Sequence, residues 1–127
     1  MASMRSPLGR ALGLGSAKEG VALWWAQRVS AVALVPLGLW FAASLISLAG
    51  ADRAHLVLWF KGPIAAILTI LTIAAVFYHG ALGVQVVIED YAPSEGMKIA
   101  GIVLAKLVAL LLAVAGIFAV LKLALGG

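Results

Sequence analysis

Three long runs of apolar residues, separated by short polar segments, dominate the chain. They lie at about 24–49, 64–88 and 97–125, and each is long enough to cross a bilayer as a helix, which takes about 20 residues. The turn-forming residues lie between these runs, which favours helices over a β-barrel. We therefore expect an all-α membrane protein with three transmembrane helices. Because three helices can hardly enclose a large site, we expect them to form part of a heteromeric anchor bundle.

The first 23 residues differ from the rest because they are polar or small. Pro7 and several glycines predict an irregular segment here, and the order of features is not that of a secretory signal. We expect 1–23 to be a cytoplasmic N-terminal segment, either a loosely ordered tail or a docking surface for a soluble partner. Residues 24–127 then form a single three-helix transmembrane domain, in which Pro36 predicts a kink in the first helix.

The composition agrees with a membrane protein. The chain is 65% hydrophobic and 11% charged, against about 45–50% and about 25% in soluble domains. It has no cysteine, so it supplies no disulfide, no CxxC zinc site and no cysteine ligand of an iron–sulfur cluster. The net charge of +4 would suggest nucleic acid in a soluble protein. Here the basic residues lie at the ends of the runs, so membrane topology explains them and we expect no nucleic-acid partner.

The distribution of basic residues predicts the orientation in the membrane. Basic residues are more frequent in cytoplasmic segments. If the N-terminus and the second loop lie on one side, that side carries five basic residues against three on the other: Arg5, Arg10, Lys18, Arg28 and Lys98 against Arg53, Lys61 and Lys122. The N-terminus is therefore expected in the cytoplasm, which places His79 in the cytoplasmic half of the second helix.

His79 lies inside the second apolar run. An ionisable residue within a span is costly and marks a functional site. Gly80 and Gly83 beside it leave room for a flat ligand or a closely packed helix. His79 is then either an axial ligand of haem iron or a histidine that bonds a neighbouring helix. His55 lies at the opposite end of the span, so a second iron ligand would have to come from another chain.

Asp90 and Tyr91 end the second run and precede Pro93. They are either a helix stop with an aromatic belt or a proton-handling pair at the mouth of an apolar pocket. A quinone needs such a site, with apolar walls and a donor for each carbonyl oxygen. Arg28 begins the first run on the same side. It either snorkels to the headgroups or pairs with a haem propionate, and Lys106 in the third run is expected to snorkel.

These residues resemble those of a known family, the SdhD-type membrane anchor subunit of succinate dehydrogenase (succinate:quinone oxidoreductase, complex II). The pattern similar to the second helix of that family is His79-Gly80-x-x-Gly83-x-Gln85-x-x-x-Glu89-Asp90-Tyr91. Alphaproteobacterial members in particular resemble the segments Pro7-Leu8-Gly9-Arg10 and Trp25-x-Gln27-Arg28-x-Ser30-Ala31. The signature of the partner anchor, His-Arg-x-Ser/Thr-Gly, is only approximated, which favours the SdhD type.

The resemblance implies roles for four residues. His79 matches the axial ligand of haem b, whose other ligand lies on an SdhC-type cytochrome b anchor subunit. Tyr91 matches the tyrosine that bonds a ubiquinone carbonyl, and Asp90 the acidic residue beside it. Arg28 falls near a haem propionate or the quinone site. No residue of this chain would be catalytic in the oxidation of succinate.

The resemblance also implies an assembly and a location. The partners are the SdhC-type anchor, an iron–sulfur subunit and a flavoprotein subunit, together with membrane lipid. The location is the bacterial inner membrane, which the chain crosses several times. Electrons from the iron–sulfur subunit would reduce ubiquinone as the substrate. Two alternatives remain open: a fumarate reductase anchor that oxidises quinol, and a cofactor-free membrane assembly or structural protein.

Overall fold

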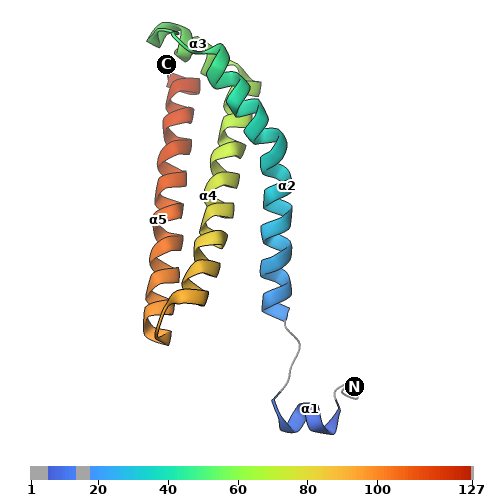
Figure 1. The fold of residues 1–127 in the computed structure, drawn as a ribbon. Coiled ribbons are helices and arrows are strands. Elements are labelled where there is room, and N and C mark those ends of the chain that lie inside the picture. The colour runs from blue at the N-terminus through green and yellow to red at the C-terminus, as the bar shows by residue number, and fades with distance from the viewer. Residues whose placement is uncertain (1–5, 14–17, 127) are drawn as a thin grey trace.

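The structure is a computed structural model that describes residues 6–13 and 18–126. Arg5, which contributes to the predicted orientation, lies outside the described residues. Within these ranges all regular structure is helical and there is no strand (Figure 1). Three stretches are long and apolar enough to cross a membrane: Gly20–Ser47, Pro63–Tyr91 and Glu95–Gly126. The expected fold class is therefore confirmed.

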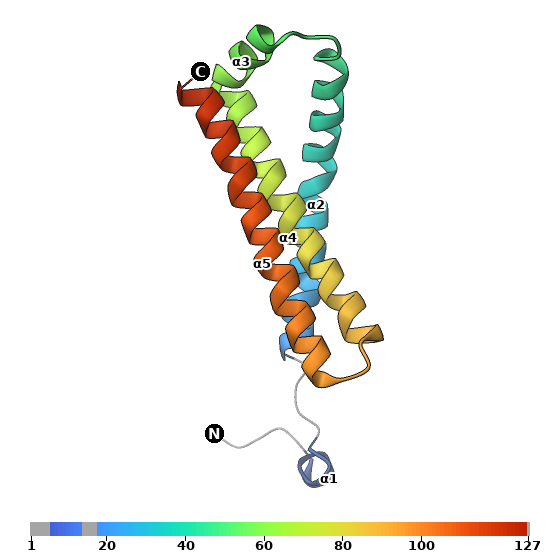
Figure 2. The same cartoon turned by 90° about the vertical axis from the view of Figure 1, so that its left-hand side faces the viewer.

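Helix α4 (Pro63–Tyr91) is the middle helix of the bundle. It packs against α2 (Lys18–Ser47) on one side and against α5 (Glu95–Leu121) on the other, and Figure 2 shows α2 and α4 crossing at an angle. Helix α5 continues into a π-helical turn at Lys122–Gly126. Helix α4 therefore has one face against α2 and the other against α5, and each face can form a different kind of site.

A short helix, α3 (Arg53–Lys61), lies between α2 and α4 in the sequence and covers one end of the bundle (Figure 1). It begins where the backbone N–H of His55 donates to Oδ1 of Asp52 at 2.8 Å. It contacts α4 and the π-helical turn. His55 therefore lies at the end of the bundle opposite to Tyr91.

The bend in α2 and the start of α5 each follow from one residue in the sequence. Helix α2 bends near its middle (Figure 1), and Pro36 lies inside it, where it lacks the N–H that a helix residue donates to the fourth carbonyl before it. Helix α5 begins at Ser94, whose Oγ accepts a hydrogen bond from the N–H of Met97 at 3.2 Å. That bond satisfies one of the free donors in the first helical turn. Ser94 is thus the N-cap of α5.

The N-terminal segment differs from the expected irregular chain. Residues Pro7–Ala11 form a helix, α1, in which Ser6 Oγ accepts from the N–H of Gly9 at 3.0 Å. Proline is tolerated at the first position of a helix because its missing N–H would be unpaired there. Gly13 follows with φ of 72°, a conformation that glycine adopts readily. The expectation of an irregular segment was therefore wrong for these residues.

Helix α4 extends three residues beyond 88, where the second apolar run is expected to end. The helix includes Glu89, Asp90 and Tyr91, and it ends at Ala92, which is extended with ψ of 132°. The residue before a proline is disfavoured in a helical conformation, so Pro93 sets the end rather than the acidic residues. Asp90 and Tyr91 are consequently held on the same rigid helix as His79.

Candidate functional site

A hydrogen bond between α2 and α4 holds His79. Its Nδ1 lies 2.9 Å from Oγ of Ser30, and the two residues are 49 positions apart in the sequence. Ser30 is buried, with 7% of its surface exposed, and its hydroxyl also donates to the backbone carbonyl of Gln27 at 3.0 Å. Among the side-chain hydrogen bonds of the described residues, this is the only one between two membrane-spanning helices. It fixes the position of the imidazole ring in the bundle.

The two interpretations of His79 that the sequence leaves open are compatible in this geometry. The bond to a neighbouring helix uses Nδ1. The other ring nitrogen, Nε2, makes no hydrogen bond to any residue that the structure describes. A histidine that ligates a metal usually has this arrangement, with one nitrogen bonded to a protein group and the other directed to the metal. His79 therefore fits the role of a single axial ligand.

The two glycines that follow His79, Gly80 and Gly83, leave room on different faces of α4. A Cβ atom added to Gly80 would meet no heavy atom within 4 Å. One added to Gly83 would only reach ordinary contact distance, 3.9 Å, from Nε2 of Gln27. Within the two described ranges, no three His, Asp or Glu side chains gather where they could hold a metal ion. What this part of the chain offers to iron is one imidazole nitrogen, which suits a haem better than a site built from protein ligands of this chain alone.

A pocket of about 490 Å³ lies between the first turns of α2 and the last turns of α4. We call it the α2–α4 pocket, and it is lined by Gly20, Leu23, Trp24, Gln27, Arg28, Gly83 and Val86. The side-chain carbonyl oxygens of Gln27 and Gln85 are buried without a hydrogen-bond partner among the described residues. Buried polar atoms are almost always paired in a complete structure. Their partners are therefore to be sought in water, a cofactor or another subunit.

Arg28 lies at the edge of this pocket and is exposed. Its guanidinium carbon is 5.2 Å from the ring centroid of Trp24, which is within the range of a cation–π contact. Among the described side chains, the ion pair that forms is Lys98–Glu95 at 3.6 Å, so no carboxylate neutralises Arg28 in this part of the chain. The guanidinium is thus placed to bind an anionic group near the α2–α4 pocket.

Asp90 and Tyr91 lie in the last turn of α4 and are exposed, Tyr91 at 82%. Neither lines the α2–α4 pocket or the pocket between α4 and α5. Asp90 follows His79 by eleven residues, which is close to three helical turns and about 16 Å along the axis. The structure therefore brings His79 and Ser30 together, links Ser30 to Gln27 of the α2–α4 pocket, and leaves Asp90 and Tyr91 exposed in the last turn of α4.

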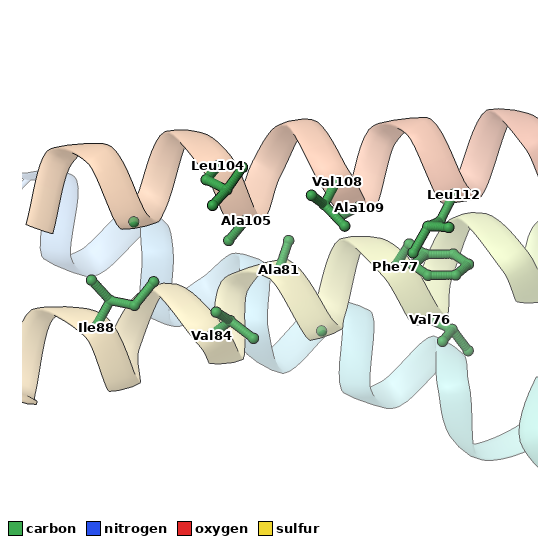
Figure 3. A pocket seen from close by; sticks show the side chains of 12 residues that line it. Val76, Phe77, Ala81, Val84, Ile88, Leu104, Ala105, Val108, Ala109 and Leu112 are labelled. Atoms are coloured by element: carbon green, nitrogen blue, oxygen red, sulfur yellow. The ribbon is translucent and has the colours of Figure 1, made fainter. Parts of the chain in front are cut away.

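The opposite face of α4 is entirely apolar. A pocket of about 630 Å³ lies between α4 and α5 (Figure 3), lined by Val76, Phe77, Gly80, Ala81, Val84, Ile88, Gly101, Leu104, Ala105, Val108, Ala109 and Leu112. It offers no ligand to iron and no donor to a quinone. This pocket is the larger of the two. The polar side chains that could bind a cofactor nevertheless lie on the α2 side of α4.

Ser30 and Gln85 are the functional candidates whose roles the sequence does not reveal. Both occur in the motifs quoted above, but nothing in the local pattern pairs Ser30 with a residue 49 positions away. Gln85 donates from Nε2 to Oε1 of Glu89 at 2.8 Å. The spacing of four residues on one helix is a signal that could have suggested this second bond. The partner of Ser30 could be found only from the packing of α2 on α4.

Comparison with known proteins agrees with the geometry. A family profile described as succinate dehydrogenase/fumarate reductase transmembrane subunit matches residues 2–120. The succinate dehydrogenase hydrophobic membrane anchor subunit of Rickettsia bellii is 35% identical over 117 residues, 91% of this chain and 93% of that protein. The protein of the same name from Paracoccus denitrificans is 31% identical over 121 residues, 95% and 93% of the two chains. No solved structure gives a significant match.

Proposed function

This chain belongs to the succinate dehydrogenase/fumarate reductase transmembrane subunit family, as a membrane anchor subunit of succinate dehydrogenase, and on that premise we propose that it helps to hold haem b and forms part of the site where ubiquinone is reduced. The observation that carries the haem proposal is the geometry of His79. Its Nδ1 is bonded to Ser30 at 2.9 Å, while Nε2 stays free among the described residues. The free nitrogen is the iron ligand, and an SdhC-type cytochrome b anchor supplies the second one.

Arg28 supports the same proposal. Haem carries two propionates, and an exposed guanidinium that pairs with no carboxylate among the described side chains is suited to bind one of them. Gly83, one helical turn after His79, lines the α2–α4 pocket, and the absence of a side chain there would leave room for the edge of a flat macrocycle. When bound, haem b supplies a one-electron couple in the membrane. The residues of this chain bind it, orient it and exclude water around it.

The residues at the C-terminal end of α4 support the quinone proposal. Reduction of ubiquinone to ubiquinol consumes two electrons and two protons. The hydroxyl of Tyr91 donates a hydrogen bond to a quinone carbonyl oxygen, and Asp90 passes protons from water to the reduced quinone. Since both side chains are exposed in this chain, the remaining walls of the site come from partner subunits. The electrons come from an iron–sulfur subunit, which a flavoprotein subunit reduces with electrons from succinate.

The location follows from the same premise. The chain crosses the membrane several times. We place it in the bacterial inner membrane with its N-terminus in the cytoplasm, where the iron–sulfur and flavoprotein subunits dock. In the structure Arg28 and Lys98 lie near the Tyr91 end of the bundle, whereas Arg53 and Lys61 lie in or at the end of α3 at the other end. This separation agrees with the orientation that the basic residues predict.

The experiment that tests the haem proposal compares two histidines. The intact complex is purified in mild detergent and its reduced-minus-oxidised absorption spectrum is recorded. We expect a b-type band that is lost or strongly reduced in His79→Ala. The matched control is His55→Ala, because His55 is exposed at the opposite end of the bundle, and its band is expected to match the wild type. A full b-type band in His79→Ala would rule out His79 as a ligand.

A second candidate function is the anchor of a fumarate reductase, which oxidises quinol. The description of the family profile includes this enzyme, and the same residues would serve the reverse reaction. The reduction potentials of the haem and of the bound quinone separate the two directions. A potential well below that of ubiquinone would favour fumarate reduction. A protein without any cofactor is the remaining alternative, and the absence of a b-type band in the wild-type complex would support it.

A further inference from the structure

We propose that Ser30 is a positioning residue that selects the tautomer of His79 and thereby tunes the iron to which His79 binds. This inference rests on the proposed haem role of His79. It adds a residue on α2 to a site whose ligand lies on α4. The observation that carries it is the pair of contacts made by one hydroxyl oxygen, 2.9 Å to Nδ1 of His79 and 3.0 Å to the carbonyl of Gln27.

A serine hydroxyl has one proton to donate, and a backbone carbonyl can only accept. In this geometry the proton of Ser30 is donated to the carbonyl of Gln27. Toward His79 the hydroxyl can then only accept a hydrogen bond, so Nδ1 must carry the proton of the imidazole. The lone pair is left on Nε2, and a nitrogen with a free lone pair is what a metal requires of its ligand.

The opposite arrangement is unfavourable in a membrane. If Ser30 donated to Nδ1, the proton of the ring would lie on Nε2. No acceptor for Nε2 exists among the described residues, and an unsatisfied donor is costly where there is no water. The hydroxyl of Ser30 is buried, so it has little freedom to find another partner. Both the contacts and the surroundings therefore favour the tautomer that leaves Nε2 free.

The same bond affects the electronic properties of the ligand. An imidazole whose Nδ1–H donates to an acceptor becomes a more basic ligand at Nε2. Donation from Ser30 to Gln27 polarises the hydroxyl and strengthens its acceptor character. A more basic ligand stabilises ferric over ferrous iron. Ser30 should therefore lower the reduction potential of the haem, and the potential should rise when the hydroxyl is removed.

The test uses two substitutions of nearly equal shape, Ser30→Thr and Ser30→Val, in the intact complex. Threonine keeps a hydroxyl that can bond a helix carbonyl, and valine lacks it. Haem content, the reduction potential of the haem and the low-spin ferric EPR g values are measured. We expect Ser30→Thr to match the wild type. We expect Ser30→Val to raise the potential by up to about 59 mV, which equals a tenfold loss of preference for ferric iron in a one-electron couple, and to shift the g values.

Ser44 provides a matched control on the same helix. It is buried, 9% exposed, and its hydroxyl donates to the carbonyl of Trp40 at 2.8 Å, with no hydrogen bond to a histidine among the described residues. Ser44→Ala should leave the haem potential and g values unchanged. Equal shifts in Ser44→Ala and Ser30→Val would show a general packing effect and overturn the inference. If valine prevents assembly, the smaller Ser30→Ala gives the same measurement.

The outcomes separate this inference from the haem proposal. A b-type haem that is lost in His79→Ala but keeps the wild-type potential in both Ser30→Val and Ser30→Ala would overturn the role of Ser30 alone. Absence of a b-type haem from the wild-type complex would overturn both. Wild-type behaviour of Ser30→Thr together with a raised potential or loss of haem in Ser30→Val supports the inference.

Discussion

His79 and Asp90 lie on one uninterrupted helix, α4, which extends through Tyr91. Eleven residues separate them, so they are close to the same helical phase. His79 is half-buried and bonded to α2, whereas Asp90 is exposed in the last turn. A single rigid element therefore connects a buried imidazole to the aqueous end of the bundle, and substitutions at its two ends should have separable effects.

Tyr91→Phe should lower ubiquinone reductase activity while succinate oxidation with an artificial acceptor stays near wild type. The reason is that phenylalanine keeps the ring and removes the donor to the quinone carbonyl, and loss of one neutral hydrogen bond of about 1 kcal/mol lowers the rate roughly fivefold. Tyr78→Phe is the control, because Tyr78 is a partly exposed tyrosine in the middle of α4. Equal losses of both activities in Tyr91→Phe would indicate faulty assembly rather than a quinone contact.

Arg28→Gln should lower the reduction potential of the haem, because removal of a positive charge near the iron favours its ferric state. Arg28→Lys keeps the charge and should retain more of the wild-type potential, although it cannot bind a propionate through two parallel bonds. Redox titration of the complex measures both. Lys106→Gln on α5 is the charge-matched control, since Lys106 is exposed on another helix. If Arg28→Gln and Lys106→Gln leave the potential equally unchanged, Arg28 does not lie near the haem.

Gly116→Ala should destabilise the contact of α5 with α4. A Cβ at this position would lie 3.3 Å from Cδ1 and 3.4 Å from Cγ2 of Ile73, closer than a packed interior accepts without adjustment. Overpacking of this kind costs about 1–3 kcal/mol. The thermal unfolding of the purified complex should begin at a lower temperature, and Ile73→Val should restore part of the loss. Gly38→Ala is the control, because a Cβ at Gly38 would meet nothing within 4 Å. The unfolding temperature of this variant should stay at the wild-type value.

Ser94→Ala should loosen the first turn of α5, because the Oγ that accepts from the N–H of Met97 is lost. The loss of such a cap costs about 1 kcal/mol. Amide hydrogen exchange in the first turn should become faster, whereas Ser94→Asp, which keeps an acceptor at the helix start, should preserve its protection. Equal exchange rates in Ser94→Ala and the wild type would contradict this capping role.

The sequence alone determines the membrane-spanning architecture and the main chemical candidate. Long apolar runs, the cap at Ser94 and the cost of placing His79 inside a span are local properties, so they can be read from neighbouring residues. The apolar run does not determine the end of α4, because the helix continues through the polar residues Glu89, Asp90 and Tyr91. Pro93 decides the end of the helix through the backbone of the residue before it.

Only the tertiary structure shows which residue holds His79 and which face of α4 it occupies. In water, the contrast between polar and apolar positions orients a helix. In a membrane, lipid and protein neighbours are equally apolar, so helix rotation depends on close packing and interhelical hydrogen bonds. Packing of Ile73 against Gly116 and of Ile88 against Gly101 directs one face of α4 to α5. The opposite face then meets α2, where Ser30 bonds Nδ1 of His79 and Nε2 makes no hydrogen bond to a described residue.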